Sequence, residues 1–257
     1  MSSTEIISVC ELIHGAICRL KNLIRNAIPS IGKWESDVES ANLIILISRD
    51  VESVILLARE NTDLLPSALC LTRSVLEKAA KVMWMIHPDD PFMREIRWLA
   101  QLKTEEDHFA RLAAFFNRLN IDATGVLQTR DTIKEFRIDV QNQLPSGYVP
   151  LKKLPDFNSV LSELGEEKKY LMFMHLSQYT HGTHVATSTY RRGLGTMKQP
   201  NKPITSRDWQ IIFEVCFFCI GNAGLRLAER LGRDPADYLD QEAVNLIQDA
   251  ITNLGSN

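Results

Sequence analysis

The stretch PSALCLTRSVLEKAAKVMWMI, residues 66–86, decides the fold that we expect for this chain. Apolar residues fall on almost every side of a helix built from it, whereas a surface helix carries only an apolar stripe. A helix that is apolar nearly all round belongs at the centre of a core, so other helices must surround it. The sequence therefore predicts an all-α fold.

Helical periodicity continues on both sides of this stretch. Asp90-Pro91 has the order of an N-cap followed by a proline in the first turn, and Ser36-x-x-Glu39 has the spacing of a capping box. The 257 residues include only 12 glycines and 10 prolines. That is few for an all-β fold, which needs a turn every ~8–12 residues.

We expect a single helical-bundle domain over residues 1–257, with seven to nine helices and no sheet. Helix should make up more than roughly 60% of the chain. Gly/Pro loops are expected at 144–157 and 191–203. The expected helices cover 4–27, 36–61, 66–87, 91–119, 124–142, 156–164, 166–190 and 206–231, with a final helical piece from Asp234-Pro235.

The N-terminal residues do not have the pattern of a secretory signal, because Glu5 and Glu11 interrupt them and no basic residue stands at the start. The longest apolar stretches, 43–47 and 211–220, are shorter than the ~20 residues that span a bilayer. We therefore expect a cytoplasmic protein with no membrane contact. Cys216-x-x-Cys219 lies in a helical pattern without a second ligand pair, which favours two small core residues over a metal or redox site.

Arg73 and Glu77 stand four residues apart on the central helix, so their side chains share one face. A charged pair on a core helix is unfavourable unless both groups have partners. Two interpretations remain open. The pair ties this helix to a neighbour, or Arg73 holds an anion in a cleft while Glu77 fixes its orientation.

Three of the six histidines lie in the expected helix 166–190. Helical spacing places Tyr170, Ser177, His181 and His184 on one stripe, with Gln178 beside it. His175 falls off this stripe, and the spacing is not that of a His-Glu-x-x-His zinc site. We therefore assign no metal and no cofactor. A buried His181 bonded to Ser177 or to the Arg73–Glu77 pair, and a His181 that acts as an acid or base, both remain open.

The stretch from Lys168 to Arg207 contains seven Lys or Arg residues and no Asp or Glu. The whole chain has a net charge of −3, so these seven positive charges leave −10 on the remaining residues. A basic loop of this kind suits a ligand that carries phosphate. Arg191, Arg192 and Lys198 are the candidate anion ligands, and Gly193-x-Gly195 allows backbone amides to approach. A solvated loop with incidental charge is the alternative.

Two motifs together resemble a known family: Arg-x-x-x-Glu at Arg73, and Tyr-x₆-Ser-x₃-His-Gly-Thr beginning at Tyr170. This combination is similar to an all-helical bacterial family of unknown function that occurs near mobile elements and phage-defence genes. That family is distantly similar to HEPN domains, which include metal-independent ribonucleases of toxin–antitoxin systems. The HEPN motif places Arg a few residues before His, whereas here His184 precedes Arg191 and Arg192.

The resemblance implies a bacterial defence- or toxin-type protein that acts on RNA or a nucleotide. His181 would then take a proton from a ribose hydroxyl, and Arg73, Arg191 or Arg192 would stabilise the charge on phosphorus. The alternative is a non-enzymatic sensor, antitoxin-like or scaffold module that forms a homodimer or binds a protein encoded by a neighbouring gene. A metal-dependent helical hydrolase is the third hypothesis. The candidate catalytic residues are Arg73, Glu77, His181 and His184, and the candidate ligand-binding residues are Tyr170, Ser177, Gln178, Arg191, Arg192 and Lys198.

Overall fold

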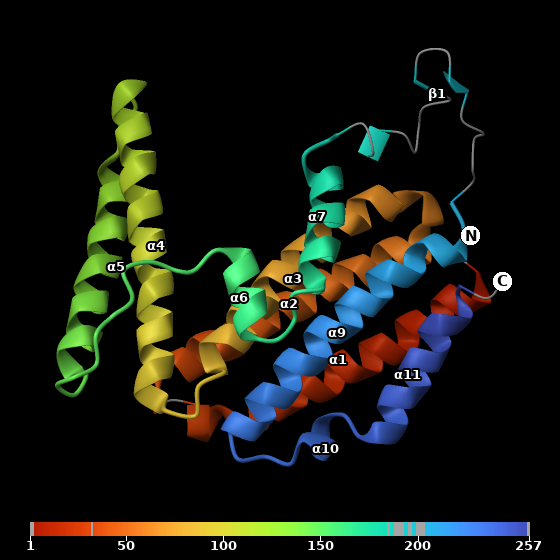
Figure 1. Cartoon of the computed structure of the whole chain (residues 1–257), viewed down its shortest axis with the longest axis horizontal. Helices are drawn as coiled ribbons and strands as arrows, with labels where there is room; N and C mark the ends of the chain where they lie inside the picture. The colour runs from red at the N-terminus through yellow and green to blue at the C-terminus, as the bar shows by residue number, and fades with distance from the viewer. Residues whose placement is uncertain are drawn as a thin grey trace.

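The computed structural model of the chain describes residues 3–31, 33–183, 186–187, 193–194, 197–198 and 204–255. Ten α-helices cover most of these ranges, which confirms the all-α class (Figure 1). They are α1 (Thr4–Ile31), α2 (Glu35–Glu60), α3 (Leu65–Ile86), α4 (Pro91–Arg118), α5 (Thr124–Gln143), α6 (Phe157–Glu163), α7 (Lys169–Thr180), α9 (Ser206–Arg230), α10 (Pro235–Tyr238) and α11 (Gln241–Asn253). A 3-10 turn, Thr62–Leu64, precedes α3.

Two details differ from the expected element count. The last helical piece is divided into α10 and α11, because Leu239 is extended and Asp240 caps a new helix by accepting a hydrogen bond from the backbone of Ala243. In addition, β1 (Gly193–Leu194) and β2 (Met197–Lys198) form a short antiparallel pair, although no sheet was expected. Each strand has only two residues, so this pair does not change the fold class.

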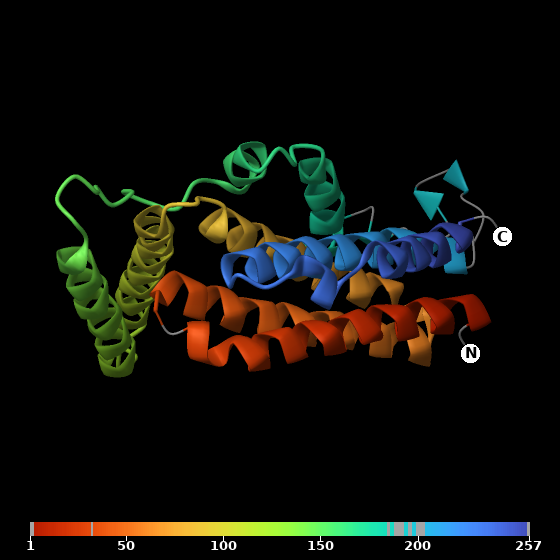
Figure 2. The same cartoon turned by 90° about the horizontal axis from the view of Figure 1, so that it is seen from below.

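The helix α3 lies at the centre, as its apolar sequence predicts, and packs against α2, α4, α6, α7 and α9. The views in Figures 1 and 2 show α1 and α2 as one layer, α3, α9 and α11 as the next, and α6 and α7 outside it. Large side chains fill the space between the helices, among them Trp84, Trp209 and Phe213. The core is therefore a stack of long helices around the stretch that the sequence singled out.

The helices α4 and α5 form a hairpin, residues 91–143, that leaves this bundle and runs across its long axis (Figures 1 and 2). A small separate apolar cluster of Met85, Trp98 and Leu99 lies at its base. Along its length α5 has no buried residue. The hairpin is thus attached to the bundle near one end, and the connection after α5 contacts α4 further along, where the Leu154 N–H donates to Thr104 Oγ1 at 3.4 Å.

Three local predictions are wrong. The first helix does not stop before Pro29 but continues to Ile31. A proline in the last turn removes only one intrahelical hydrogen bond there. Ser36 does not cap α2, because that helix begins at Glu35 and Ser36 bonds Glu95 of α4 instead.

The third error concerns α7, which ends at Thr180 rather than near Tyr190. Gly182 adopts a left-handed conformation with φ of 58°. Its N–H donates to the Tyr179 carbonyl at 3.3 Å, and the N–H of Thr183 donates to the Gln178 carbonyl at 3.1 Å. This pair of bonds is a Schellman motif, in which glycine ends a helix because it adopts positive φ without strain.

The helix α9 is capped by Thr205 and Asp208 and runs through the core. Cys216 and Cys219 are fully buried, which confirms them as core residues, and burial raises the pKa of Cys216 to about 12. By length and hydropathy α9 is a candidate membrane span. The apolar stretch 211–220 alone had suggested that this part of the chain is too short to cross a bilayer. In the structure 67% of its most apolar window is buried against other helices, and a core helix meets the same criteria.

Candidate functional site

The Arg73–Glu77 pair of α3 is only partly buried. Arg73 Nη2 donates to Glu77 Oε1 at 3.2 Å, and the two side chains keep 19% and 37% of their surface exposed. The Arg73 guanidinium lies over the ring of Phe173 in α7, 4.9 Å from its centroid. Its buried Nε has no hydrogen-bond partner among the described residues. The pair therefore joins α3 to α7 mainly through a cation–π contact.

The polar candidates on α7 bond to their own helix. Ser177 Oγ donates to the Phe173 carbonyl at 2.7 Å, and Gln178 Nε2 donates to the Met174 carbonyl at 3.4 Å. Tyr170 stacks on Phe173 with the ring centroids 5.8 Å apart, so it shares that ring with Arg73. The structure thus brings Arg73, Glu77 and Tyr170 together around Phe173.

His181 does not join them. It is the C-cap residue of α7, its side chain is exposed, and no hydrogen bond or ion pair links that side chain to the described residues. The interpretation of His181 as a buried residue bonded to Ser177 or to the Arg73–Glu77 pair is therefore wrong. The prediction failed because α7 ends at Gly182. A longer helix would have kept His181 and His184 on the same face as Tyr170 and Ser177.

The remaining candidates cannot be placed. His184, Arg191 and Arg192 lie outside the described residues, and so does the side chain of Lys198. Of the other cations in the acid-free stretch, Lys168 and Arg207 are exposed. The ammonium of Lys169 lies over the ring of Phe218 in α9, 4.2 Å from its centroid.

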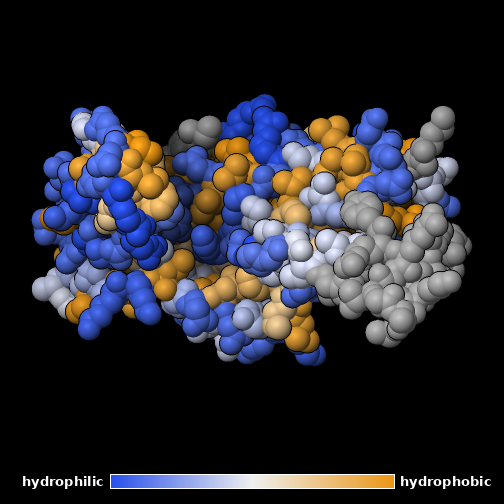
Figure 3. Space-filling view, turned by 90° about the horizontal axis from the view of Figure 1, so that it is seen from above, coloured by the Kyte–Doolittle hydropathy of each residue, from blue (hydrophilic) through white to orange (hydrophobic). Residues whose placement is uncertain are grey.

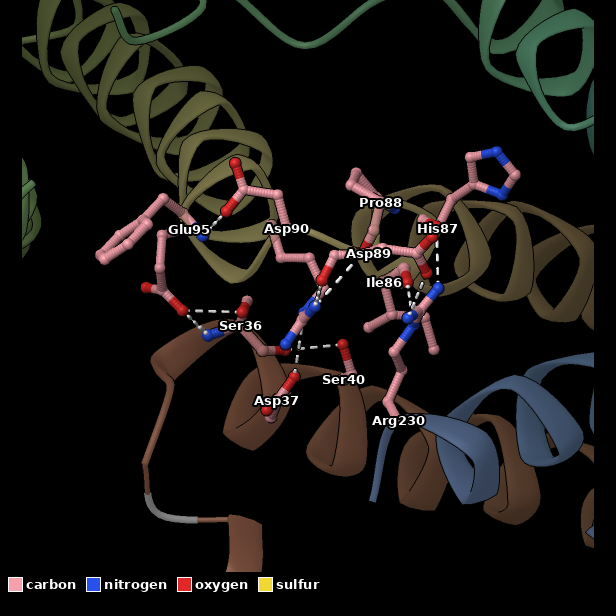
Figure 4. A network of polar contacts seen from close by, with 12 residues as sticks. Ser36, Asp37, Ser40, Ile86, His87, Pro88, Asp89, Asp90, Glu95 and Arg230 are labelled. Atoms are coloured by element: carbon pink, nitrogen blue, oxygen red, sulfur yellow. Dashed lines mark hydrogen bonds and ion pairs between the residues drawn. The ribbon is translucent and has the colours of Figure 1, made fainter. Parts of the chain in front are cut away.

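The most deeply buried charges lie instead at the base of the hairpin (Figure 4). Arg94 Nε of α4 is 3.5 Å from Asp37 Oδ1 of α2, and these side chains are only 7% and 6% exposed. Arg94 Nη1 also donates to the carbonyls of Pro88 and Asp89, at 3.2 and 2.9 Å. Burial raises the pKa of Asp37, although Arg94 acts in the opposite direction.

Glu95 adds a second link between α4 and α2. Its Oε1 accepts from the backbone N–H and the Oγ of Ser36, at 2.9 and 2.7 Å, while the residue is 3% exposed. In Figure 4 the other carboxylate oxygen points away from Ser36. Burial raises the pKa of Glu95, and the two hydrogen bonds oppose that effect.

Arg230 at the end of α9 holds the turn between α3 and α4 (Figure 4). It donates to the Ile86 and His87 carbonyls at 2.9 and 3.0 Å and forms an ion pair with Asp89 at 2.7 Å. His87 Nδ1 lies 2.8 Å from Arg226 Nη1. Burial, together with the nearby Arg226, lowers the pKa of His87.

Arg97 attaches α4 to α6. It donates to the Trp84 carbonyl at 2.5 Å, forms an ion pair with Glu163, and lies 4.6 Å from the Trp84 ring centroid. Trp84 Nε1 donates to the same carboxylate, also at 2.5 Å. The start of α4 is therefore fixed by charged groups to three other parts of the fold: α2, the α3–α4 turn with α9, and α6.

Further out, charge also joins the two helices of the hairpin. Glu106 of α4 is buried, and its carboxylate is bonded by Lys103 at 2.9 Å and by Arg137 of α5 at 3.0 Å. Burial opposes ionisation, but these two hydrogen bonds lower the pKa of Glu106. At the tip, Phe115, Leu119 and Ile121 are exposed by 46 to 50%.

Two pockets flank these elements. The larger one, of 660 Å³, lies between α9, α11 and Lys169 and includes Glu214, Asp249 and Phe218. The smaller one, of 390 Å³, lies at the base of the hairpin between the α1–α2 connection, α4 and α5. Arg73, Glu77 and His181 line neither pocket.

The sequence carried weak signals for the residues that were missed. Arg94, Glu95 and Arg97 stand beside apolar residues at the start of a helix, but their partners Asp37, Ser36 and Glu163 are 57 to 66 positions away. The run of acidic residues from Glu105 to Asp107 is typical of a solvated helix face, yet Glu106 is buried against Arg137. Within the described ranges no group of three His, Cys, Asp or Glu residues could hold a metal ion.

Comparisons of the chain with protein-family models, with curated proteins and with solved structures find no match.

Proposed function

We propose that this chain is a single-domain, non-enzymatic helical module of the cytoplasm that forms a homodimer through the α4–α5 hairpin. The observation that carries the proposal is the hairpin itself. It leaves the bundle, α5 has no buried residue, and three large apolar side chains are exposed at its tip. Exposed apolar clusters of this kind are typical of protein–protein contacts.

The charge of the hairpin favours a second copy as the partner. Residues 91–143 contain eight Lys or Arg and eight Asp or Glu, so the hairpin is neutral in a chain of net charge −3. Two neutral surfaces with both signs interspersed approach without repulsion and form opposite-charge contacts across a two-fold axis. In Figure 3 hydrophobic atoms gather within the mostly hydrophilic surface of the hairpin, on the left.

The test is sedimentation velocity over a range of protein concentrations. The wild type should sediment with twice the 29.2 kDa mass of the chain, because two hairpins bury their tips against each other. Phe115→Glu combined with Ile121→Glu should shift it to the monomer while leaving the circular dichroism spectrum unchanged. The matched control is Leu171→Glu on α7, which charges a side chain that is 71% exposed but lies outside the hairpin.

A wild type that sediments as a monomer at every concentration contradicts the dimer. A tip variant that sediments like the Leu171→Glu control contradicts the placement of the interface.

The acid-free stretch Lys168–Arg207 favours a second candidate function, binding or cleavage of RNA or a nucleotide in bacterial defence. Purified protein is incubated with total RNA in excess chelator and run on a gel. Arg191→Ala with Arg192→Ala should reduce binding, and the control pair Arg111→Ala with Arg118→Ala, two exposed arginines of the neutral hairpin, should not.

His181→Ala should abolish cleavage and retain binding. Cleavage that requires added metal favours a metal-dependent hydrolase. If the protein neither binds nor cleaves RNA, only the proposal of a dimeric module remains.

A further inference from the structure

The smaller pocket has an unusual combination of side chains. Its walls are aromatic, from Trp34, Phe92 and Phe136. Trp34 and Phe92 meet edge to face with their centroids 5.3 Å apart, and Phe136 is held by an edge contact with Trp98 at 5.4 Å. The faces of aromatic rings carry partial negative charge, which attracts cations.

Carboxylates complete the lining. Glu35, Glu95 and Asp139 face a single positive group, Lys33, so the lining carries a net charge of −2. Glu95 is 3% exposed and uses Oε1 for its bonds to Ser36, while no described residue donates a hydrogen bond to Oε2. Oε2 is not one of the fully buried polar atoms that lack a partner, so it remains an accessible acceptor in a residue that lines the pocket. A donor or a cation in the pocket can therefore bond to it.

The chain itself places an alkylammonium group at this site. The Nζ atom of Lys33 lies 5.7 Å from the ring centroid of Trp34, within the ~6 Å range of a cation–π contact. Among the residues that the structure describes, no group of three His, Cys, Asp or Glu side chains could hold a metal ion, and the three pocket carboxylates are no exception. A large, weakly hydrated cation suits this lining better than a small ion.

We propose that the pocket at the base of the hairpin binds a small organic cation, an alkylammonium compound, between Trp34, Phe92 and the Glu95 and Asp139 carboxylates. The 390 Å³ volume lies in the range of small-ligand sites, about 300–1,000 Å³. The Lys33 ammonium occupies one aromatic face as an internal competitor. This site is separate from the exposed tip that carries the proposed dimer contact, so the two proposals are tested by different measurements.

The first experiment compares two probes of equal shape by isothermal titration calorimetry on the full-length protein at constant ionic strength. Choline carries a quaternary ammonium, and 3,3-dimethyl-1-butanol replaces that nitrogen by carbon. Choline should bind saturably and at least about fivefold more tightly than the neutral probe, the upper end of the range expected for a solvent-exposed cation–π contact. Equal affinities, or no saturable heat with choline, would overturn the proposal.

The second experiment uses variants. Trp34→Leu should weaken choline binding at least about fivefold, and Asp139→Asn should also weaken it. Lys33→Ala should strengthen binding, because the competing ammonium is removed. The control is Lys169→Ala, which removes the ammonium over Phe218 outside this pocket and should leave the affinity unchanged.

Trp34 precedes α2 as its N-cap residue, so the fold of Trp34→Leu is checked by circular dichroism. If that variant does not fold, the exposed Asp139 and Lys33 positions still decide the question. A Lys33→Ala variant that binds choline no better than Lys169→Ala, together with an unaffected Asp139→Asn variant, would contradict the assignment.

Discussion

Two ion pairs in this protein have similar chemistry and very different surroundings. Arg73 and Glu77 lie one turn apart on α3, and more than a third of the Glu77 side chain is exposed. Asp37 and Arg94 come from α2 and α4 and are almost completely buried. An apolar sequence around a charged pair therefore does not identify it as the buried one. Burial depends on what the fold places over the pair, and α4 covers Asp37.

Changing Arg94 should cause the largest loss of unfolding free energy at either pair. Arg94→Ala leaves the Asp37 carboxylate buried without its cation, and such a change costs about 3–5 kcal/mol of unfolding free energy. The backbone carbonyls of Pro88 and Asp89 also lose their donor. Urea unfolding followed by circular dichroism measures the effect. A loss no larger than that of Glu77→Ala would contradict the difference between the two pairs.

The pH dependence of the unfolding free energy tests the buried carboxylate of Glu95, which lies next to the Asp37–Arg94 pair. Because the pKa of Glu95 is raised in the folded state, that state holds the proton more tightly than the unfolded chain does. This contribution to the unfolding free energy is present below the ordinary pKa of 4.5 and is lost as the pH rises through the raised pKa. Glu95→Gln keeps an acceptor for Ser36 and removes the titration.

The unfolding free energy of the wild type minus that of Glu95→Gln should therefore decrease between pH 4 and pH 7. Urea unfolding of both proteins at each pH gives this difference. A difference that increases with pH would mean that the Glu95 pKa is lowered.

A smaller effect is expected at the exposed pair. Glu77→Ala should lower the unfolding free energy by about 1 kcal/mol or less, because solvent screens the pair and Arg73 keeps its contact with Phe173. A fully buried pair would instead lose about 3–5 kcal/mol of unfolding free energy on the same kind of change. The same urea titration measures it, with Arg94→Ala as the reference.

The smallest effect is expected at His181. His181→Ala should change the unfolding free energy by no more than about 0.5 kcal/mol, since the side chain is exposed and has no bonding partner among the described residues. Gly182→Ala provides the contrast one residue away. Its left-handed backbone should cost about 1–2 kcal/mol with any side chain, although nothing described lies within 4 Å of an added Cβ. Thermal melts of both variants would show whether the loss belongs to the helix stop.

The helices of the core were predictable because their signals are local. The apolar stretch around Leu76 predicts the centre, and Asp90-Pro91 marks a helix start that the structure confirms. The candidate site was less predictable, since it depended on where α7 ends. Gly182 was the signal for the end of the helix, but the spacing of His181 and His184 suggested that the helix continues past it. The Asp37–Arg94 and Arg97–Glu163 pairs join distant helices, and spacing along one chain does not reveal such partners.

The attachment of α4 has a mechanical consequence. With 28 residues at about 1.5 Å each, α4 is about 42 Å long, so a rotation of about 5° at its start moves its far end by about 4 Å. Any rotation of α4 would therefore pivot among Asp37, Arg94 and Glu95, and the helix would multiply it toward the tip of the hairpin. A change there that is too small to disturb the core becomes, at Phe115 and Leu119, a displacement as large as an atomic contact distance.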